Sequence, residues 1–248
     1  MRMFCVVCLG VVGVTLGCSA DDSSSSARDD AGGADATVDT SSDATQSDVG
    51  PGDALVSQDA GRCSVTGDGR TTVSFVNLCT QTVSFRGSDI EAGDVNPGGV
   101  ACRDVGAATG EIASKRYWGF VGEDPGAGRH SLAEFTFNTD FEDYDWYNLS
   151  HVDAFNLPLR IFAVDRPACR TLTCADDLLA GCPEQGRYPS DGETVACVSP
   201  DRDDPTNPVA VWFEAGCADA YSWSKDDAES MAACAGEDYD IVFCPTAN

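Results

Sequence analysis

Short runs in which hydrophobic and polar residues alternate recur along the chain from residue 71 onward. Such runs, bounded by Gly, Asp, Asn and Pro, predict β-strands. Strands are expected over residues 71–75, 82–85, 116–120, 133–137, 156–164 and 238–244. Pro158 stands near the start of the fifth run, which suits an edge strand. Many short strands joined by turns predict a mainly β protein built as a β-sandwich.

Helical patterns are scarce and fall in the C-terminal half of the chain. Residues 174–181 place two aspartates in a first turn and Gly181 after the last turn, which predicts a short helix. Residues 211–220 predict a second helix. Both segments lie among cysteines, so the pattern predicts a β core followed by a lobe that disulfides hold together.

The N-terminal end has the pattern of an export signal. An apolar run over residues 3–16 is too short to span a bilayer and follows a basic residue. It ends in small and apolar residues before Cys18, an end that resembles a bacterial lipobox with its leucine one position late. We expect a signal peptide over residues 1–17 and lipid on Cys18, with a plain secretory signal as the alternative. Ser19 after the cysteine, by resemblance to Gram-negative lipoproteins, predicts anchoring at the outer membrane or cell surface.

The segment after Cys18 has low complexity and a strong negative charge. Residues 19–62 are mostly Ser, Asp, Ala, Gly and Thr, without an aromatic residue. Because such a segment cannot bury enough apolar surface to fold, residues 18–62 are predicted to be a disordered tether. The remaining domain, residues 63–248, carries 31 acidic and 12 basic residues, a net charge of -19. That sign disfavours nucleic acid and anionic lipid as partners.

Ten cysteines fall within residues 63–248. An even number in an exported chain predicts five disulfides, whose connectivity the spacing alone leaves open. Zinc sites use paired cysteines two residues apart, and no pair here has that gap. The sequence also has no nucleophile elbow, P-loop or dinucleotide fingerprint. We therefore expect no metal and no cofactor.

Several motifs occur in a fixed order along residues 71–248. They are VSFVNLC at 73–79, LAEF at 132–135, DAFNLP at 153–158, CADAYSW at 217–223 and FCPTA at 243–247. Together they resemble the thaumatin-like protein family. The resemblance implies a flattened β-sandwich with a disulfide-rich lobe and a cleft between the two. Here the insert between Trp118 and the LAEF motif is reduced, and the lobe between Cys197 and Cys217 lacks the family's usual extra cysteines, so this is a trimmed form.

The resemblance also implies how the cysteines pair. It joins Cys79 with Cys244, Cys169 with Cys234, Cys174 with Cys217, and Cys182 with Cys197. Cys63 and Cys102 are left over, and we pair them by elimination without support from the family.

Many members of the family line the cleft with one Arg, one Glu and three Asp. The matching positions here are Arg116, Glu134, Asn148, Asp153 and Asp226. The resemblance implies binding of polysaccharide of the β-1,3-glucan type, and in some members its hydrolysis. Hydrolysis would need two carboxylates, Glu134 as acid and Asp153 as its partner. Asn148 stands where the family has Asp and cannot act as an acid, so we rank binding, with a possible antifungal role, above catalysis.

The stretch before Asn148 is acidic and aromatic. Glu142, Asp143 and Asp145 are expected in a solvated turn, and a calcium site is the alternative. Tyr144, Trp146, Tyr147 and Tyr221 are expected either to cover sugar rings or to belong to the core. A third reading of the whole chain is a protein-binding inhibitor or a surface adhesin. We expect a monomer.

Overall fold

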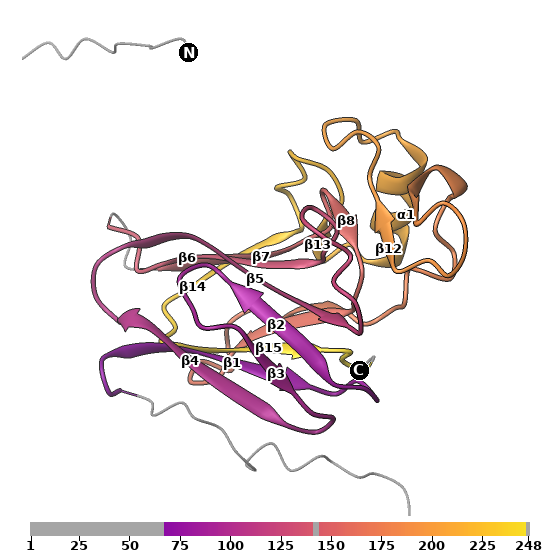
Figure 1. Ribbon diagram of the computed structural model, residues 1–248. Helices are drawn as coiled ribbons and strands as arrows, with labels where there is room; N and C mark the ends of the chain where they lie inside the picture. Colours follow the sequence, from indigo (N-terminus) through magenta and orange to yellow (C-terminus); the bar gives the residue numbers. More distant parts are fainter. Residues whose placement is uncertain (1–66, 141–143, 247–248) are drawn as a thin grey trace, which may run out of the picture. The chain divides into compact units, whose positions relative to one another are not determined.

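The computed structural model describes residues 67–140 and 144–246 (Figure 1). Strands dominate these residues, which confirms the predicted mainly β fold with a disulfide-rich lobe. The predicted signal peptide, Cys18, the tether, Cys63, Glu142 and Asp143 lie outside the described residues. Within the described ranges, no helix is both long and apolar enough to cross a membrane.

The first sheet has five strands in the order β10-β9-β15-β1-β4. Its strands are β1 (Arg70–Asn77), β4 (Val100–Ala107), β9 (Leu159–Ala163), β10 (Leu172–Cys174) and β15 (Asp238–Phe243). β15 lies in the middle, parallel to β1 and antiparallel to β9. The predicted edge position of the strand after Pro158 is wrong, because β9 pairs on both sides. The proline precedes the first paired residue, so its missing N–H leaves the ladder intact.

The second sheet has seven strands in the order β13-β7-β6-β5-β2-β3, with β14 also paired to β7. Its strands are β2 (Val83–Gly87), β3 (Gly93–Val95), β5 (Ile112–Val121), β6 (Leu132–Phe137), β7 (Asp145–Ser150), β13 (Ala220–Tyr221) and β14 (Met231–Cys234). The turn between β1 and β2 therefore carries the chain from one sheet to the other. Asn77 holds that turn, since its amide donates to the carbonyls of Gln81 and Val95 at 2.8 and 2.7 Å.

Aromatic side chains fill the space between the two sheets. Along β6 the burial alternates, with Ala133, Phe135 and Phe137 inside and Glu134 on the outer face. Phe75 of β1 stacks on Phe85 of β2 with ring centroids 4.2 Å apart. Each sheet thus buries one face against the other, as in a sandwich, and leaves its second face available for polar residues.

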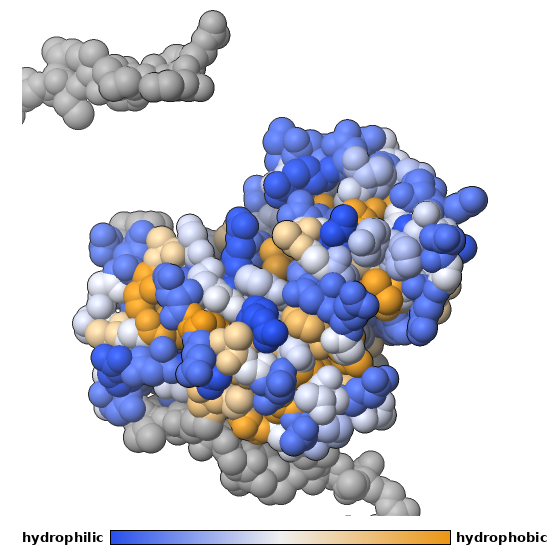
Figure 2. Space-filling view, in the orientation of Figure 1, coloured by the Kyte–Doolittle hydropathy of each residue, from blue (hydrophilic) through white to orange (hydrophobic). Residues whose placement is uncertain are grey.

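The lobe has a small core of its own and lies beside the stacked sheets in Figure 1. It contains β8 (Ala154–Phe155), β11 (Arg187–Tyr188), β12 (Ala196–Val198), the 3-10 turn η1 (Glu184–Gly186) and α1 (Pro208–Gly216). Phe155, Leu178, Val209 and Phe213 pack together with Cys182 and Cys197. The lobe surface in Figure 2 is largely hydrophilic.

The two helix predictions had different outcomes. Residues 174–181 form no helix, which corrects the first one. Cys174 is the end of β10, and Asp177 accepts the N–H of Leu179 at 3.0 Å, a local turn that competes with a helix. The second helix exists as α1 but begins earlier, because Asn207 accepts the N–H groups of Val209 and Ala210 as its N-cap.

Four disulfides join described cysteines. They are Cys79–Cys244, Cys169–Cys234, Cys174–Cys217 and Cys182–Cys197, the four pairs that the resemblance implied. The fifth proposed pair includes Cys63, outside the described residues. Disulfides in this number are typical of a protein that folds in an oxidising compartment.

Candidate functional site

Three of the five predicted cleft residues form one row across neighbouring strands. Arg116 of β5 pairs with Glu134 of β6, and Glu134 pairs with Asn148 of β7. Because directly paired residues project from the same face of a sheet, the three side chains lie next to one another on the outer face. We call Arg116, Glu134 and Asn148 the polar row.

Both oxygens of the Glu134 carboxylate accept a donor from the row. Arg116 Nε lies 2.9 Å from Glu134 Oε1, and Asn148 Nδ2 donates to Glu134 Oε2 at 3.1 Å. The Arg116 side chain is 62% exposed and that of Glu134 is 26% exposed. An ion pair this exposed contributes little to stability, so the row is better suited to contact with a ligand than to holding the fold together.

Tyr221 is buried beside β7, the strand that carries Asn148. β13 runs parallel to β7, with Tyr221 paired to Ser150, and the Tyr221 hydroxyl donates to Asp227 Oδ1 at 2.8 Å. The pKa of Tyr221 is raised mainly by burial and further by the carboxylates of Asp227, Asp226 and Glu134. Its hydroxyl therefore keeps its proton. Asp227 was not among the predicted residues. Its only signal in the sequence is that it follows Asp226 directly.

Asp226 turns toward helix α1. Its Oδ2 accepts the N–H and the hydroxyl of Ser222, each at 3.0 Å, and the same hydroxyl lies 3.2 Å from Glu214 Oε2. Burial, and next the charge of Asp226, raise the pKa of Glu214. Asp226, Glu214 and Trp223 line a hollow of about 420 Å³. Within the described part of the chain, no hydrogen bond or ion pair joins Asp226 to the polar row.

Asp153 contacts Arg202, which is not a residue of the polar row. Its Oδ1 lies 3.6 Å from Arg202 Nε, and its side chain is 39% exposed. Its carbonyl accepts the N–H of Ser199 at 2.9 Å, which ties this loop to the lobe. No hydrogen bond joins it to Glu134 among the described residues. The structure therefore brings three of the five predicted residues into direct contact and gives the other two separate partners.

In the acidic stretch before the polar row, the structure corrects the predicted position of Asp145. Asp145 is 2% exposed, so its predicted place in a solvated turn is wrong. Its carboxylate accepts the N–H of Asn138 at 2.7 Å and the hydroxyl of Tyr239 at 2.6 Å, and burial raises its pKa. The calcium alternative stays a prediction, because Glu142 and Asp143 lie outside the described residues.

The nearby aromatic residues divide between surface and core. Tyr147 is fully buried and donates its hydroxyl to the carbonyl of Arg170, so it is a core residue. Tyr221 is 8% exposed, whereas Tyr144 is 45% exposed. Of these three tyrosines, Tyr144 offers the most ring surface to a ligand.

A family profile and individual known proteins both match this chain. A sequence profile of the Thaumatin family matches residues 77–245. Pathogenesis-related thaumatin-like protein 3.5 of Cryptomeria japonica is 37% identical over 135 residues, which are 47% of this chain and 54% of that protein. Zeamatin of Zea mays is 35% identical over 135 residues, 48% of this chain and 58% of that protein. The chain thus spans about half the length of the curated relatives it matches.

Two solved structures match this chain at lower sequence identity. The protein elicitor MoHrip2 from Magnaporthe oryzae has a TM-score of 0.39 at 12% identity, over 71% of this chain and 99% of that chain. The thaumatin-like xylanase inhibitor TLXI has a TM-score of 0.36 at 14% identity, over 70% and 99%. The profile match covers more than half of the residues, and on that ground the chain belongs to the Thaumatin family.

Proposed function

We propose that this chain is an exported, lipid-anchored thaumatin-like domain that binds polysaccharide of the β-1,3-glucan type. The observation that carries the proposal is the polar row. It places a guanidinium, a carboxylate and a carboxamide side by side on an open sheet face. Sugar hydroxyls both donate and accept hydrogen bonds, and this set of groups offers both kinds of partner.

The contacts of Glu134 and Asp153 favour binding over hydrolysis. A glycosidase needs two carboxylates that flank the same glycosidic oxygen. Here Glu134 is bracketed by Arg116 and Asn148, Asp153 lies against Arg202, and Asn148 takes the place of a family carboxylate. Hydrolysis is therefore the second candidate, and the same experiment tests it.

The test is co-sedimentation of the full, oxidised chain with insoluble β-1,3-glucan, followed by an assay of the supernatant for reducing sugar. We expect protein in the pellet and no released sugar. Glu134→Gln removes the charge that both neighbours contact and should weaken binding roughly tenfold, since hydrogen bonds to charged groups contribute about 1.5–3 kcal/mol.

The matched control is Glu91→Gln, an exposed glutamate on another part of the surface. Equal binding by the parent and Glu134→Gln would contradict the assignment of the polar row. Sugar release that Glu134→Gln abolishes would mean a glucanase. If the protein neither pellets with the glucan nor releases sugar, glucan is refuted as the ligand. The search then turns to protein partners.

A further inference from the structure

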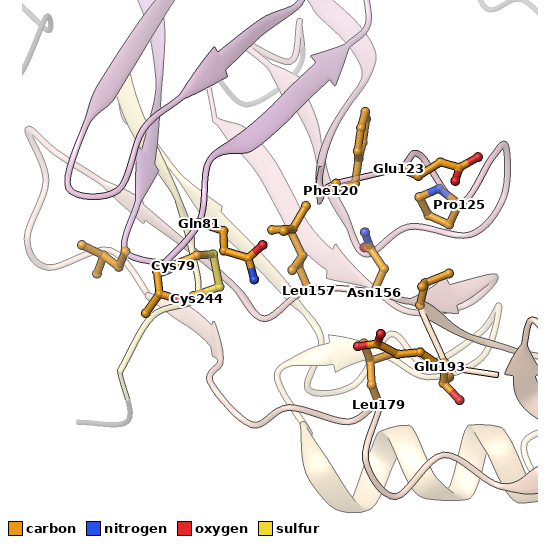
Figure 3. Close-up of a pocket in the computed structure, with 16 residues that line it drawn as sticks. Cys79, Gln81, Phe120, Glu123, Pro125, Asn156, Leu157, Leu179, Glu193 and Cys244 are labelled. Atoms are coloured by element: carbon orange, nitrogen blue, oxygen red, sulfur yellow. A yellow bond between two sulfur atoms is a disulfide. The ribbon is translucent and has the colours of Figure 1, made fainter.

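A second hollow, drawn in Figure 3, is lined by none of the residues of the polar row. Its volume is about 580 Å³. Ligand pockets in proteins typically measure about 300–1,000 Å³, so this one can hold a molecule the size of a short peptide. The β-sandwich supplies one wall and residues of the lobe supply the other. We call it the rear pocket.

The surface of the rear pocket is more apolar than polar. Phe120 and Leu157 line it from the sandwich, and Leu179 and Val195 line it from the lobe. The Cys79–Cys244 disulfide closes one end (Figure 3). Val195 is 42% exposed, which is a large fraction for an aliphatic side chain. A concave group of exposed apolar residues is typical of a binding surface.

Two carboxylates stand at the edge of this apolar surface. Figure 3 shows Glu123 and Glu193 on opposite sides of the hollow, with Leu157 and Asn156 between them. Both glutamates are exposed, and neither forms a hydrogen bond or ion pair with another residue in the described ranges. None of the described residues that line the pocket is basic. Neither charge is therefore paired with a cation from the part of the chain that the structure describes.

We propose that the rear pocket binds a peptide segment of a partner protein that carries two basic side chains around an apolar centre. The apolar walls would contact the aliphatic residues of the segment, and Glu123 and Glu193 would attract its two ends. A second copy of this chain is a poor occupant, because the domain carries a net charge of -19 and copies repel. A neutral sugar would leave both carboxylates without a charged partner.

The test uses titration calorimetry of the full, oxidised chain with the capped peptide Lys-Leu-Val-Leu-Lys at low salt. The capped peptide Glu-Leu-Val-Leu-Glu serves as the opposite-charge probe. We expect saturable binding of the first peptide, weakened by added salt, and none of the second. The double variant Glu123→Gln with Glu193→Gln should raise Kd about three- to tenfold, as expected for two exposed ion pairs.

Two further variants separate the pocket from the general acidity of the chain. Glu91→Gln with Glu184→Gln removes the same charge from exposed sites outside the pocket and should leave Kd unchanged. Val195→Lys introduces a positive charge at an exposed wall position and should abolish binding. Equal weakening by the two double variants, or no saturable binding by the parent, would overturn the proposal. Glucan co-sedimentation is independent of these results, since no residue of the polar row is changed.

Discussion

Asn148 is the residue that most separates this chain from the family pattern. Its amide donates to Glu134 from the neighbouring strand. A carboxylate at that position would place two negative charges directly opposite each other, an arrangement that destabilises a sheet. The amide therefore keeps Glu134 partnered on both sides and leaves the polar row with one carboxylate fewer than the family pattern has.

Restoring the family residue tests this account. Asn148→Asp should lower the free energy of unfolding by about 1 kcal/mol at pH 7, since a donor is lost and a like charge is gained. The loss should shrink at pH 4, where carboxylates take up protons. Urea unfolding at the two pH values measures it. The same loss at both values would mean that packing, and not charge, is responsible.

Asp238 makes a second prediction at the residue scale. It is 1% exposed, its Oδ1 accepts the N–H of Thr72, and its Oδ2 has no partner among the described residues. Burial raises its pKa from 3.8 to about 6. A carboxyl whose pKa rises on folding stabilises the protein below its unfolded pKa, and that contribution is lost as pH rises through 6.

The expected result is a pH-dependent difference between the parent and Asp238→Asn. Between pH 4 and pH 7 the parent should lose about 2 kcal/mol of stability through this group. The asparagine variant keeps the acceptor for Thr72 and should lack this loss. Unfolding curves of both proteins across the range provide the measurement. Parallel curves would show that Asp238 does not titrate in this window.

At the scale of elements, β7, β8 and α1 meet around His151. The imidazole is 1% exposed, and neither ring nitrogen has a hydrogen-bond partner within the described residues. Phe155 of β8 and Phe213 of α1 lie edge-on to it, with centroids at 5.1 and 5.6 Å. Burial lowers the pKa of His151 to about 3. The lobe is therefore attached to the sandwich through a histidine that stays neutral.

His151 should make this attachment sensitive to acid. A histidine whose pKa falls on folding contributes stability above its unfolded value of 6.5, and loses it as pH falls toward 3. By pH 4 the loss should reach about 3 kcal/mol. His151→Leu should remove it. Hydrogen exchange of the α1 amides, measured at pH 7 and pH 4, tests this. The α1 amides of the parent should exchange faster than those of the variant at pH 4, and identical exchange at that pH would contradict the prediction.

The N-cap of α1 gives a prediction about one element alone. Asn207 accepts two N–H groups of the helix, and its amide donates to the carbonyls of Asp201 and Asp204 at 2.8 and 2.7 Å. Asn207→Ala should cost about 1–2 kcal/mol, and Asn207→Asp should cost less because it keeps the cap acceptor. Thermal unfolding ranks the two variants. The opposite order would mean that the amide donors matter more than the cap.

Local pattern predicted six of the strands, but it missed others such as β4 and β7, and it did not predict how the strands pair. Residues 133–137 became β6 because alternation alone fixes which side chains face the core. By contrast, β1 and β2 entered different sheets, and the side chain of Asn77 that directs them apart carries no periodic signal. The polar row followed from the motifs, because Glu134 and its neighbours lie on strands. Asp226 and Asp153 lie on loops, whose hydrogen bonds to Ser222 and Ser199 no pattern predicts.

At the scale of the whole molecule, the proposed anchor has a direct test. Cys18 lies outside the described residues, and its lipidation rests on the sequence. Cys18→Ser should move the protein from the membrane fraction to the soluble exported fraction, because a lipid chain supplies the affinity for the bilayer. Fractionation with metabolic labelling by palmitate measures both effects. A soluble parent without label would show a plain secretory signal.

The position of β15 has a consequence for biosynthesis. This strand leaves the ribosome after every other described strand, yet it occupies the centre of the five-stranded sheet between β1 and β9. It is followed at once by Cys244, the partner of Cys79. The five-stranded sheet therefore cannot be completed until this last described strand has been made, and β1 waits for a neighbour encoded more than 160 residues later. Until then the edge of β1 that later pairs with β15 stays open, so the five-stranded sheet is closed at its centre by the last strand to be made.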